Sequence, residues 1–247
     1  LERSGMAEDL LDTIGQLFGP IRGGLAFAVI FVGALLAATT GVVAASVISM
    51  GLISLPIMLR YGYDKRLASG VIAASGTLAQ IIPPSLVLII MADQLGRSVG
   101  DMYEGAMIPG LILTGLYVGF VVLVAIFKPA MCPALPPEAR TLRGVKLATR
   151  VVTTMVPPLL LIFLVLGTIF LGIATPTEGG AMGAAGALIL AIMRKRLSWK
   201  LLKQAMETTG KLSSFVVFIL VGSTVFGLVF RAVNGDLWVE HLLLSLP

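Results

Sequence analysis

The sequence is organised by six long runs without a charged residue, separated by segments in which the charges gather. The runs are 23–59, 67–92, 105–127, 151–177, 179–193 and 212–230. A helix of about 20 residues crosses the hydrocarbon core of a bilayer. A chain that is 57% hydrophobic and 13% charged has too few polar groups to cover a soluble domain. Because a helix satisfies its own backbone hydrogen bonds in lipid, the sequence predicts an all-α polytopic membrane protein.

The charges between the runs predict how the chain is oriented. Basic residues outnumber acidic ones in 60–66, 128–150 and 194–211, whereas acidic residues prevail in 93–104 and 231–240. Short loops rich in Lys and Arg stay in the cytoplasm, so we expect the first three segments there, with 128–150 as a cytoplasmic basic loop. The net charge of +5 belongs to such loops, so no nucleic-acid partner is expected.

The first run does not fit a simple crossing. As one helix, 23–59 would be about 55 Å long, yet two full crossings need about 40 residues and a turn. We therefore expect a re-entrant hairpin over 23–59 that opens to the cytoplasm. In the run 67–92, Pro83 and Pro84 remove two backbone donors near the middle, which predicts a broken helix. A membrane-spanning helix follows over 105–127.

The remaining elements follow from spacing and loop charge. Residues 1–22 carry apolar side chains at helical spacing and predict an amphipathic arm helix at the membrane interface. Since basic loops flank 151–193 on both sides, that region must leave and return. Its spans are expected at 151–174 and 178–193, with the turn near 175–180, where Pro176 and two glycines interrupt helices. A further span is expected over 212–230. The chain begins without Met and is interpreted as a fragment.

Two interruptions close in sequence predict one ion site, because freed carbonyls and half-helix ends at membrane depth can bind ions. The hairpin tip offers oxygens from Thr39, Thr40 and Gly41. The broken helix offers Gly76, Thr77, Pro83, Pro84 and Ser85. Oxygen ligands with few carboxylates suit sodium, for which Thr40, Gly41, Thr77 and Ser85 are the candidate ligands. The alternative is close helix packing, in which Thr, Ser and Gly are also common.

Glu178 is the one ionisable side chain between Arg150 and Arg194. Acids inside membrane segments are usually functional because their burial is costly. The order Thr175-x-x-Glu178 equally predicts a capping box at a helix start. Both interpretations stay open at this point.

Enzyme signatures are absent from the sequence. Cys132 and His241 are the only residues of their types, there are no paired carboxylates in an apolar context, and phosphate-loop spacing is missing. We expect no enzyme and no cofactor. Without an ATP-binding motif, uphill transport would draw on an ion gradient or on another subunit.

The order of several motifs resembles the large membrane subunit of tripartite ATP-independent periplasmic (TRAP) transporters over nearly the whole chain. These motifs are Gly33-Ala-Leu-Leu-Ala-Ala-Thr-Thr-Gly41, Leu55-Pro56 with Tyr61-Gly-Tyr63-Asp64, Ala74-Ser-Gly-Thr-Leu78, Ile82-Pro-Pro-Ser85, Pro109-Gly110 and Thr175-Pro-Thr-Glu178-Gly-Gly.

The resemblance implies an elevator-type secondary transporter of two inverted repeats, each with a hairpin and a broken helix. It places the hairpin tip at Thr39 to Ser46. Thr175, Thr177 and Glu178, which lie in the last of these motifs, are further candidates for an ion or substrate site. Residues 23–127 would be the first repeat, and 151–247 the start of a second, incomplete one. Val42 stands where the family often has a hydroxyl, so a ligand role there would fall to the backbone.

The function expected from the resemblance is sodium-coupled uptake of a small organic acid, such as a C4-dicarboxylate, across the bacterial inner membrane. The implied partners are a periplasmic substrate-binding protein, a small TRAP membrane subunit and membrane lipid. The alternatives are another ion-coupled exchanger or channel that needs no soluble partner, and a structural membrane subunit. No intramembrane Arg marks a carboxylate site, so the sequence does not identify the substrate.

Overall fold

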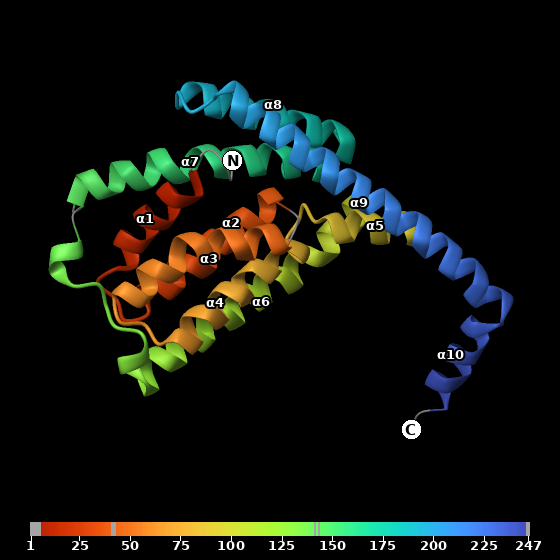
Figure 1. Cartoon of the computed structure of the whole chain (residues 1–247), viewed down its shortest axis with the longest axis horizontal. Helices are drawn as coiled ribbons and strands as arrows, with labels where there is room; N and C mark the ends of the chain where they lie inside the picture. Colours follow the sequence, from red (N-terminus) through yellow and green to blue (C-terminus); the bar gives the residue numbers. More distant parts are fainter. Residues whose placement is uncertain (1–5, 41–42, 141, 143, 246–247) are drawn as a thin grey trace. The chain divides into compact units, whose positions relative to one another are not determined.

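The computed structural model describes residues 6–40, 43–140, 142 and 144–245, and within these it contains helices and no strand (Figure 1). Four of the helices are long and apolar enough to cross a membrane: Val99–Phe127, Gly144–Phe170, Pro176–Met193 and Trp199–Ala232. The predicted all-α polytopic fold is confirmed.

The helices follow one another along the chain, and the segment 128–143 between α6 and α7 is the longest connection in the described part of the chain. They are α1 (Met6–Phe18), α2 (Gly24–Thr40), α3 (Val43–Arg60), α4 (Lys65–Thr77), α5 (Leu86–Leu95), α6 (Val99–Phe127), α7 (Gly144–Phe170), α8 (Pro176–Met193), α9 (Trp199–Ala232) and α10 (Gly235–Leu244). The 3₁₀ turns are η2 (Leu78–Gln80), η3 (Pro129–Met131) and η4 (Pro137–Ala139). Contacts divide the chain into two units, Leu1–Arg196 and Leu197–Pro247.

The second unit consists of α9 and α10, which contact each other. The predicted span 212–230 lies inside α9, whose 34 residues also include much of the preceding basic segment. A helix of that length is about 50 Å long, so it extends beyond a hydrocarbon core of about 30 Å.

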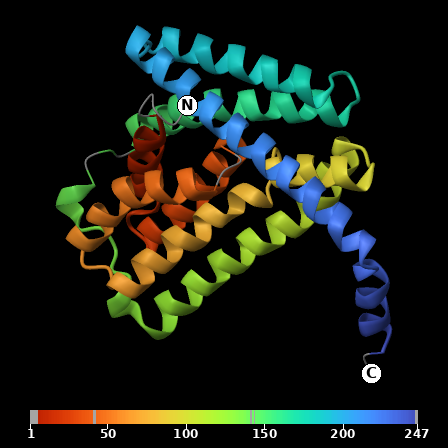
Figure 2. The ribbon, with the colours of Figure 1, turned by 45° about the vertical axis from the view of Figure 1, so that its right-hand side comes forward.

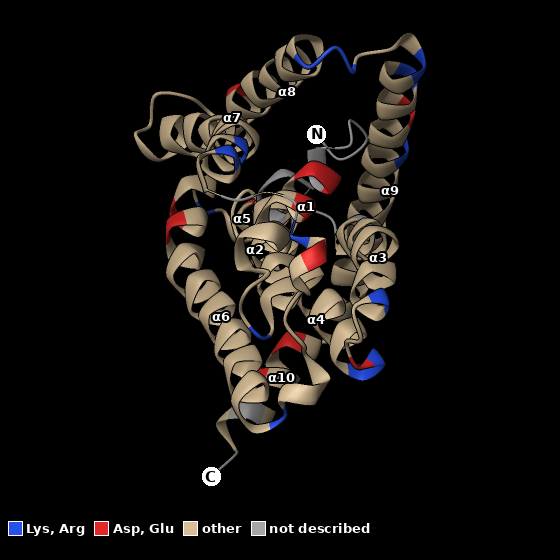
Figure 3. Ribbon diagram, turned by 90° about the vertical axis from the view of Figure 1, so that its left-hand side faces the viewer, with Lys and Arg blue, Asp and Glu red and all other residues tan. Residues whose placement is uncertain are grey.

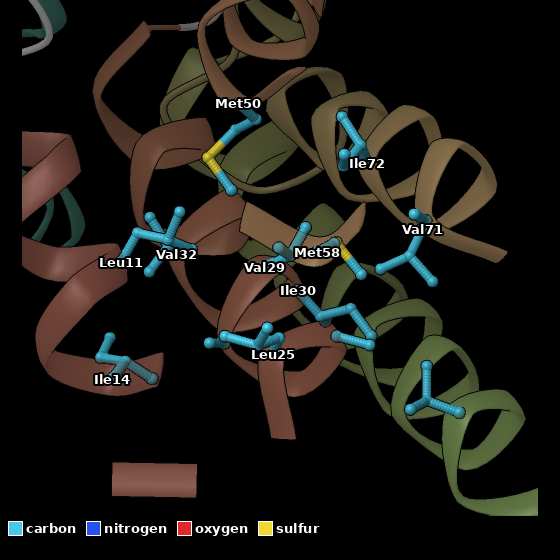
Figure 4. Packing of buried hydrophobic residues seen from close by; sticks show 14 of the residues in the cluster. Leu11, Ile14, Leu25, Val29, Ile30, Val32, Met50, Met58, Val71 and Ile72 are labelled. Carbon is cyan, nitrogen blue, oxygen red and sulfur yellow. The ribbon is translucent and has the colours of Figure 1, made fainter. Parts of the chain in front are cut away.

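The core of the first unit lies among α1, α2, α3 and α4. Figure 4 shows Leu11 and Ile14 of α1 beside side chains of α2, α3 and α4 in one buried cluster. The apolar face predicted for the arm helix is therefore largely covered by protein, since α1 contacts α2 and α7. Among the residues of that face whose burial the structure describes, Leu10 and Ile14 are buried and Leu17 is exposed, at 42%.

The run 23–59 forms two helices, α2 and α3, that lie against each other (Figure 2). The residues joining them, 41 and 42, lie outside the described part of the chain. At the opposite, open end of the pair, the hydroxyl of Tyr63 accepts a hydrogen bond from the backbone N–H of Leu25 at 3.1 Å. Burial raises the pKa of Tyr63 to about 12, so this hydroxyl stays neutral. Entry of the helix pair into a membrane stays a prediction.

The helices α7 and α8 form a second antiparallel pair, which agrees with a region that leaves and returns. Its turn lies before Pro176 and not at 175–180 as the sequence suggested. Pro176 occupies the first helical position, where its missing N–H costs nothing, and the two following glycines lie inside α8. The prolines Pro157 and Pro158 lie inside α7 without ending it.

Candidate ion site at the broken helix

The helix begun by α4 is interrupted between Thr77 and Leu86 by the turn η2 and an irregular stretch. The peptide bond between Pro83 and Pro84 in this stretch is cis. Proline supplies no N–H and disfavours helix at the preceding residue, which accounts locally for the interruption.

The interruption leaves backbone oxygens free. The carbonyls of Ile81, Ile82, Pro83 and Pro84 accept no hydrogen bond from any residue that the structure describes. Buried carbonyls normally have a partner, and each has two lone pairs to offer. Pro83 is fully buried, whereas Ile81, Ile82 and Pro84 are half-buried, so the stretch is partly covered by protein.

The two hydroxyls beside the interruption already have backbone partners. Ser85 Oγ donates to the carbonyl of Gln80 at 2.7 Å and accepts the N–H of Leu88 at 3.4 Å, as the N-cap of α5. Thr77 Oγ1 donates to the carbonyl of Ala74 at 2.7 Å. Each hydroxyl oxygen retains a lone pair, so these bonds leave both able to bind a cation.

Small residues bring α4 into close contact with both arms of the helix pair. A Cβ at Gly33 of α2 would lie 2.7 Å from Cβ of Ser75. A Cβ at Gly76 would overlap a methyl group of Val47 in α3 and lie 3.1 Å from its Cα. The end of α4 therefore packs closely between α2 and α3. Only glycine at positions 33 and 76 leaves room for this packing.

This packing places the interruption beside the residues that flank the hairpin tip. Leu78 and Ala79 of η2 are fully buried against Ala34 of α2 and Val43 of α3. From the other side, Gly110 of α6 leaves room for the side chains of Ile81 and Ile82.

The predicted site residues fall into two groups. Gly76, Thr77, Pro83, Pro84 and Ser85 belong to the broken helix, and buried Ser46 precedes the Val47 that Gly76 contacts.

Three of the predicted tip residues are less fully described. Thr39 and Thr40 form the end of α2, and nothing is described of their side chains. Gly41 lies outside the described residues.

The motif at Thr175 forms the start of α8, where both bonds of a capping box are present. Glu178 accepts the backbone N–H of Thr175 at 2.8 Å, and Thr175 Oγ1 accepts the N–H of Glu178 at 3.3 Å. Thr177 lies in the same exposed turn. The capping interpretation is therefore present in the structure, and a role of these residues in transport stays a prediction.

Sequence reasoning missed how α7 tolerates its prolines. Pro157 lacks the N–H that would otherwise bond to the carbonyl of Thr153 four residues earlier. Arg194, at the end of α8, donates from Nη2 to that carbonyl at 2.6 Å. The spacing from Pro157 back to Thr153 is readable in the sequence, but the donor comes from 41 residues away.

Sequence reasoning also missed the ion pairs that hold α1. Asp12 pairs with Arg150 of α7 at 3.2 Å, and Asp9 pairs with Arg196 at 3.0 Å and with Arg194 at 3.8 Å. The acids of the arm helix therefore pair with the beginning of α7 and with the residues that follow α8.

An all-helical chain with four candidate spans, and with an interrupted helix packed on a helix pair, defines a polytopic membrane protein with the features of a transporter. The chain belongs to the family described as "Tripartite ATP-independent periplasmic transporter, DctM component", whose model matches residues 1–247. The resemblance seen in the sequence motifs is confirmed, since both the family model and the curated relatives place the chain among the TRAP large permeases.

Curated relatives agree with this assignment. The C4-dicarboxylate TRAP transporter large permease protein DctM of Pseudomonas aeruginosa is 32% identical over 223 residues, which are 90% of this chain and 51% of the relative. The protein of the same name in Vibrio cholerae is 34% identical over 77% of this chain and 41% of its own. The isethionate TRAP transporter permease protein DctMQ of Oleidesulfovibrio alaskensis is 29% identical over 90% of this chain and 34% of its own. The chain thus spans about half the length of the curated relatives it matches.

Proposed function

We propose that the permease carries out sodium-coupled uptake of a small organic acid, and that the interrupted helix supplies part of its sodium site. The observation behind this proposal is the row of unpaired carbonyls from Ile81 to Pro84, packed beside the flanks of the hairpin tip. Oxygen atoms of backbone and hydroxyl groups are the donors that hard cations prefer.

The proposed ligands are oxygens of Thr40 and Gly41 on the tip and, on the broken helix, oxygens of Thr77 and Ser85 together with the unpaired carbonyls of Ile82, Pro83 and Pro84. A cation bound between them would add an attraction between two elements that are otherwise joined by side-chain packing. Coupling then follows from differential affinity, because sodium stabilises the arrangement in which the substrate site is complete. An elevator movement of this region is the transport step that we propose.

The substrate class rests on the names of relatives, which include C4-dicarboxylate and isethionate transporters. Both names refer to small organic acids. We propose a periplasmic substrate-binding protein and a small TRAP membrane subunit, separate or fused, as partners in the bacterial inner membrane.

The test is uptake of radiolabelled succinate, and of isethionate in parallel, by the complete permease reconstituted with its partners. Uptake should require an inward sodium gradient, and Thr40→Ala and Thr77→Ala should each raise the sodium concentration for half-maximal uptake. Thr168→Ala is the matched control, because Thr168 Oγ1 also donates to a backbone carbonyl, at 2.8 Å, but lies in α7. An unchanged sodium dependence in both variants would falsify these ligands.

A structural role for the interruption is the second candidate, because Thr77 and Ser85 both bond to the backbone. In that case the break only allows α4 to pack closely on α2 and α3. The same uptake series separates the two, since loss of packing lowers the amount of folded permease without shifting the sodium concentration for half-maximal uptake.

A further inference from the structure

A groove lies along the outside of the first unit, between the first half of α4 and the last part of α6. It has a volume of about 470 Å³, within the range of about 300–1,000 Å³ that small-molecule sites occupy. Figures 1 and 2 both show α4 and α6 side by side, and the contacts agree. The groove is separate from the proposed ion site, which lies at the opposite end of α4.

The walls of the groove are apolar and two cations stand at one end. Leu67, Val71, Leu123 and Phe127 line it, together with Arg66 and Lys128. Leu123 is 54% exposed and Phe127 is 76% exposed, so the wall is open to its surroundings. Because α6 is long and apolar enough to span a membrane, we expect lipid around its exposed side.

The two cations lack acidic partners. In the described part of the chain, neither Arg66 nor Lys128 forms an ion pair. The nearest acid in sequence, Asp64, accepts the backbone N–H groups of Arg66 and Leu67 and so caps α4. Figure 3 shows that the acidic residues of α6 lie near one end, which is its start, and 105–127 carries no charge.

The position of the cations matches the level of a lipid headgroup. Lys128 directly follows the last residue of α6, and Arg66 lies in the first turn of α4. Both belong to segments whose charge predicts the cytoplasmic side, where anionic lipids attract basic residues. A polar cation at the end of an apolar groove binds the phosphate of a lipid whose chain lies along that groove.

We propose that this groove binds an anionic phospholipid of the inner leaflet, with the phosphate at Arg66 and Lys128 and one acyl chain along α4 and α6. Charge complementarity decides this occupant, because a helix of a protein partner would need two acids at the same place. The site goes beyond the proposed transport function and does not depend on it.

Gly70 provides a direct way to close the groove. It lines the groove from α4, and a Cβ built on it would meet no atom within 4 Å. The side chain introduced by Gly70→Leu should therefore occupy the volume proposed for the acyl chain. It should leave the buried contacts of α4 unchanged. Gly70→Ala adds one methyl group at the same place and serves as the graded control.

The experiment uses the complete purified permease in nanodiscs that contain phosphatidylcholine and a small fraction of photoactivatable phosphatidylglycerol, with the diazirine in its acyl chain. After illumination, labelled peptides should come from the α4 and α6 segments that line the groove. Photoactivatable phosphatidylcholine at the same fraction gives the background. Labelling is independent of transport, so its outcome is distinct from that of the sodium experiments.

Each of Arg66→Gln and Lys128→Gln should lower phosphatidylglycerol labelling about fivefold, which corresponds to about 1 kcal/mol per basic residue near an anionic headgroup. Gly70→Leu should abolish labelling, and Gly70→Ala should reduce it partly. Lys65→Gln is the matched control, because Lys65 neighbours Arg66 but does not line the groove. Phosphatidylglycerol labelling of the Lys65→Gln permease should equal that of the unmodified permease.

Three results would overturn the proposal. One is equal labelling by the two lipids, which means that the headgroup charge is not recognised. Another is unchanged labelling in the double variant Arg66→Gln, Lys128→Gln. The third is unlabelled α4 and α6 segments with a protein cross-link at the groove, which means that another part of the permease or a partner subunit covers it.

Discussion

Two proline pairs in this chain have opposite effects on the helices that contain them. Around Pro83 and Pro84 the helix is interrupted, since α4 ends at Thr77 and α5 begins at Leu86, whereas α7 continues through Pro157 and Pro158. Each pair removes two backbone donors, so the number of lost hydrogen bonds is the same. The prolines alone therefore do not determine where a membrane helix breaks.

The difference lies in what each neighbourhood offers to the backbone. Around Pro83, buried Leu78 and Ala79 pack against α2 and α3, and Ser85 caps the new helix. In α7, Arg194 donates to the carbonyl that Pro157 leaves without a partner. A helix breaks where packing and a cap support the broken form, and continues where an outside donor satisfies the freed oxygen.

The largest effect is expected when the packing at the interruption is disturbed. Gly76→Val should destabilise the permease by about 3 kcal/mol or more, because the new side chain overlaps Val47 of α3 and cannot avoid its backbone. The measurement is the midpoint of thermal unfolding in detergent. It is obtained from the fraction of protein that stays monodisperse after heating to each temperature. Gly70→Ala, in the same helix but with open space around it, should leave the midpoint nearly unchanged. Equal midpoints for the two variants would mean that α4 does not pack on α3 as described.

The next effect concerns the donor that supports α7. Arg194→Met should cost about 1–3 kcal/mol by leaving the carbonyl of Thr153 unsatisfied. Pro157→Ala restores an N–H at the position that bonds to the same carbonyl, so it should recover much of that loss. The double-mutant cycle of Arg194→Met and Pro157→Ala, measured by thermal unfolding, should then give a coupling of about 1 kcal/mol. Strict additivity would show that Arg194 acts through its ion pair with Asp9 instead.

A smaller effect is expected at the cap that restarts the broken helix. Ser85→Ala should cost about 1 kcal/mol, the usual loss for an N-cap hydroxyl, and Ser85→Thr should recover most of it. Ser98 caps α6 in the same way, by accepting the N–H of Asp101. Ser98→Ala should therefore lower the unfolding midpoint similarly, but only Ser85→Ala should weaken sodium-dependent uptake. Equal uptake in the two variants would assign Ser85 to the cap alone.

The sequence predicted the type of fold and the place of the interruption better than it predicted the contacts between helices. Long uncharged runs identify spanning helices, and Pro83-Pro84 identifies a local break, because both signals are contained in neighbouring residues. The turn before Pro176 was placed wrongly, since proline at a helix start and proline inside a helix look alike without the cap. Two contacts depend on residues that are far apart in sequence: the hydrogen bond from Arg194 to Thr153 and the burial of the apolar face of α1. A local sequence pattern could therefore predict neither of them.

The last prediction concerns solvent and should change stability least. Irregular backbone at membrane depth is tolerated beside protein or a water-filled cavity, whereas an unbroken helix can face lipid directly. A cysteine at exposed Gln80, beside the interruption, should therefore react with a water-soluble maleimide, and sodium should slow the reaction if the cation binds there. A cysteine at Val156, which is 46% exposed on α7 one residue before its proline pair, should stay unlabelled.

Cys132, the one cysteine of the printed sequence, should add little background to this experiment. Cys132 is buried in the segment after α6, and burial raises the pKa of its thiol, although Arg22 partly opposes that shift. A raised pKa means less thiolate at neutral pH, so native labelling should be slow near pH 7 and increase only at pH values above the usual range of a thiol. If Gln80→Cys and Val156→Cys react with the maleimide at the same rate above this background, water reaches both proline pairs to the same extent. The interruption would then have no aqueous access, and an ion route through it would be excluded.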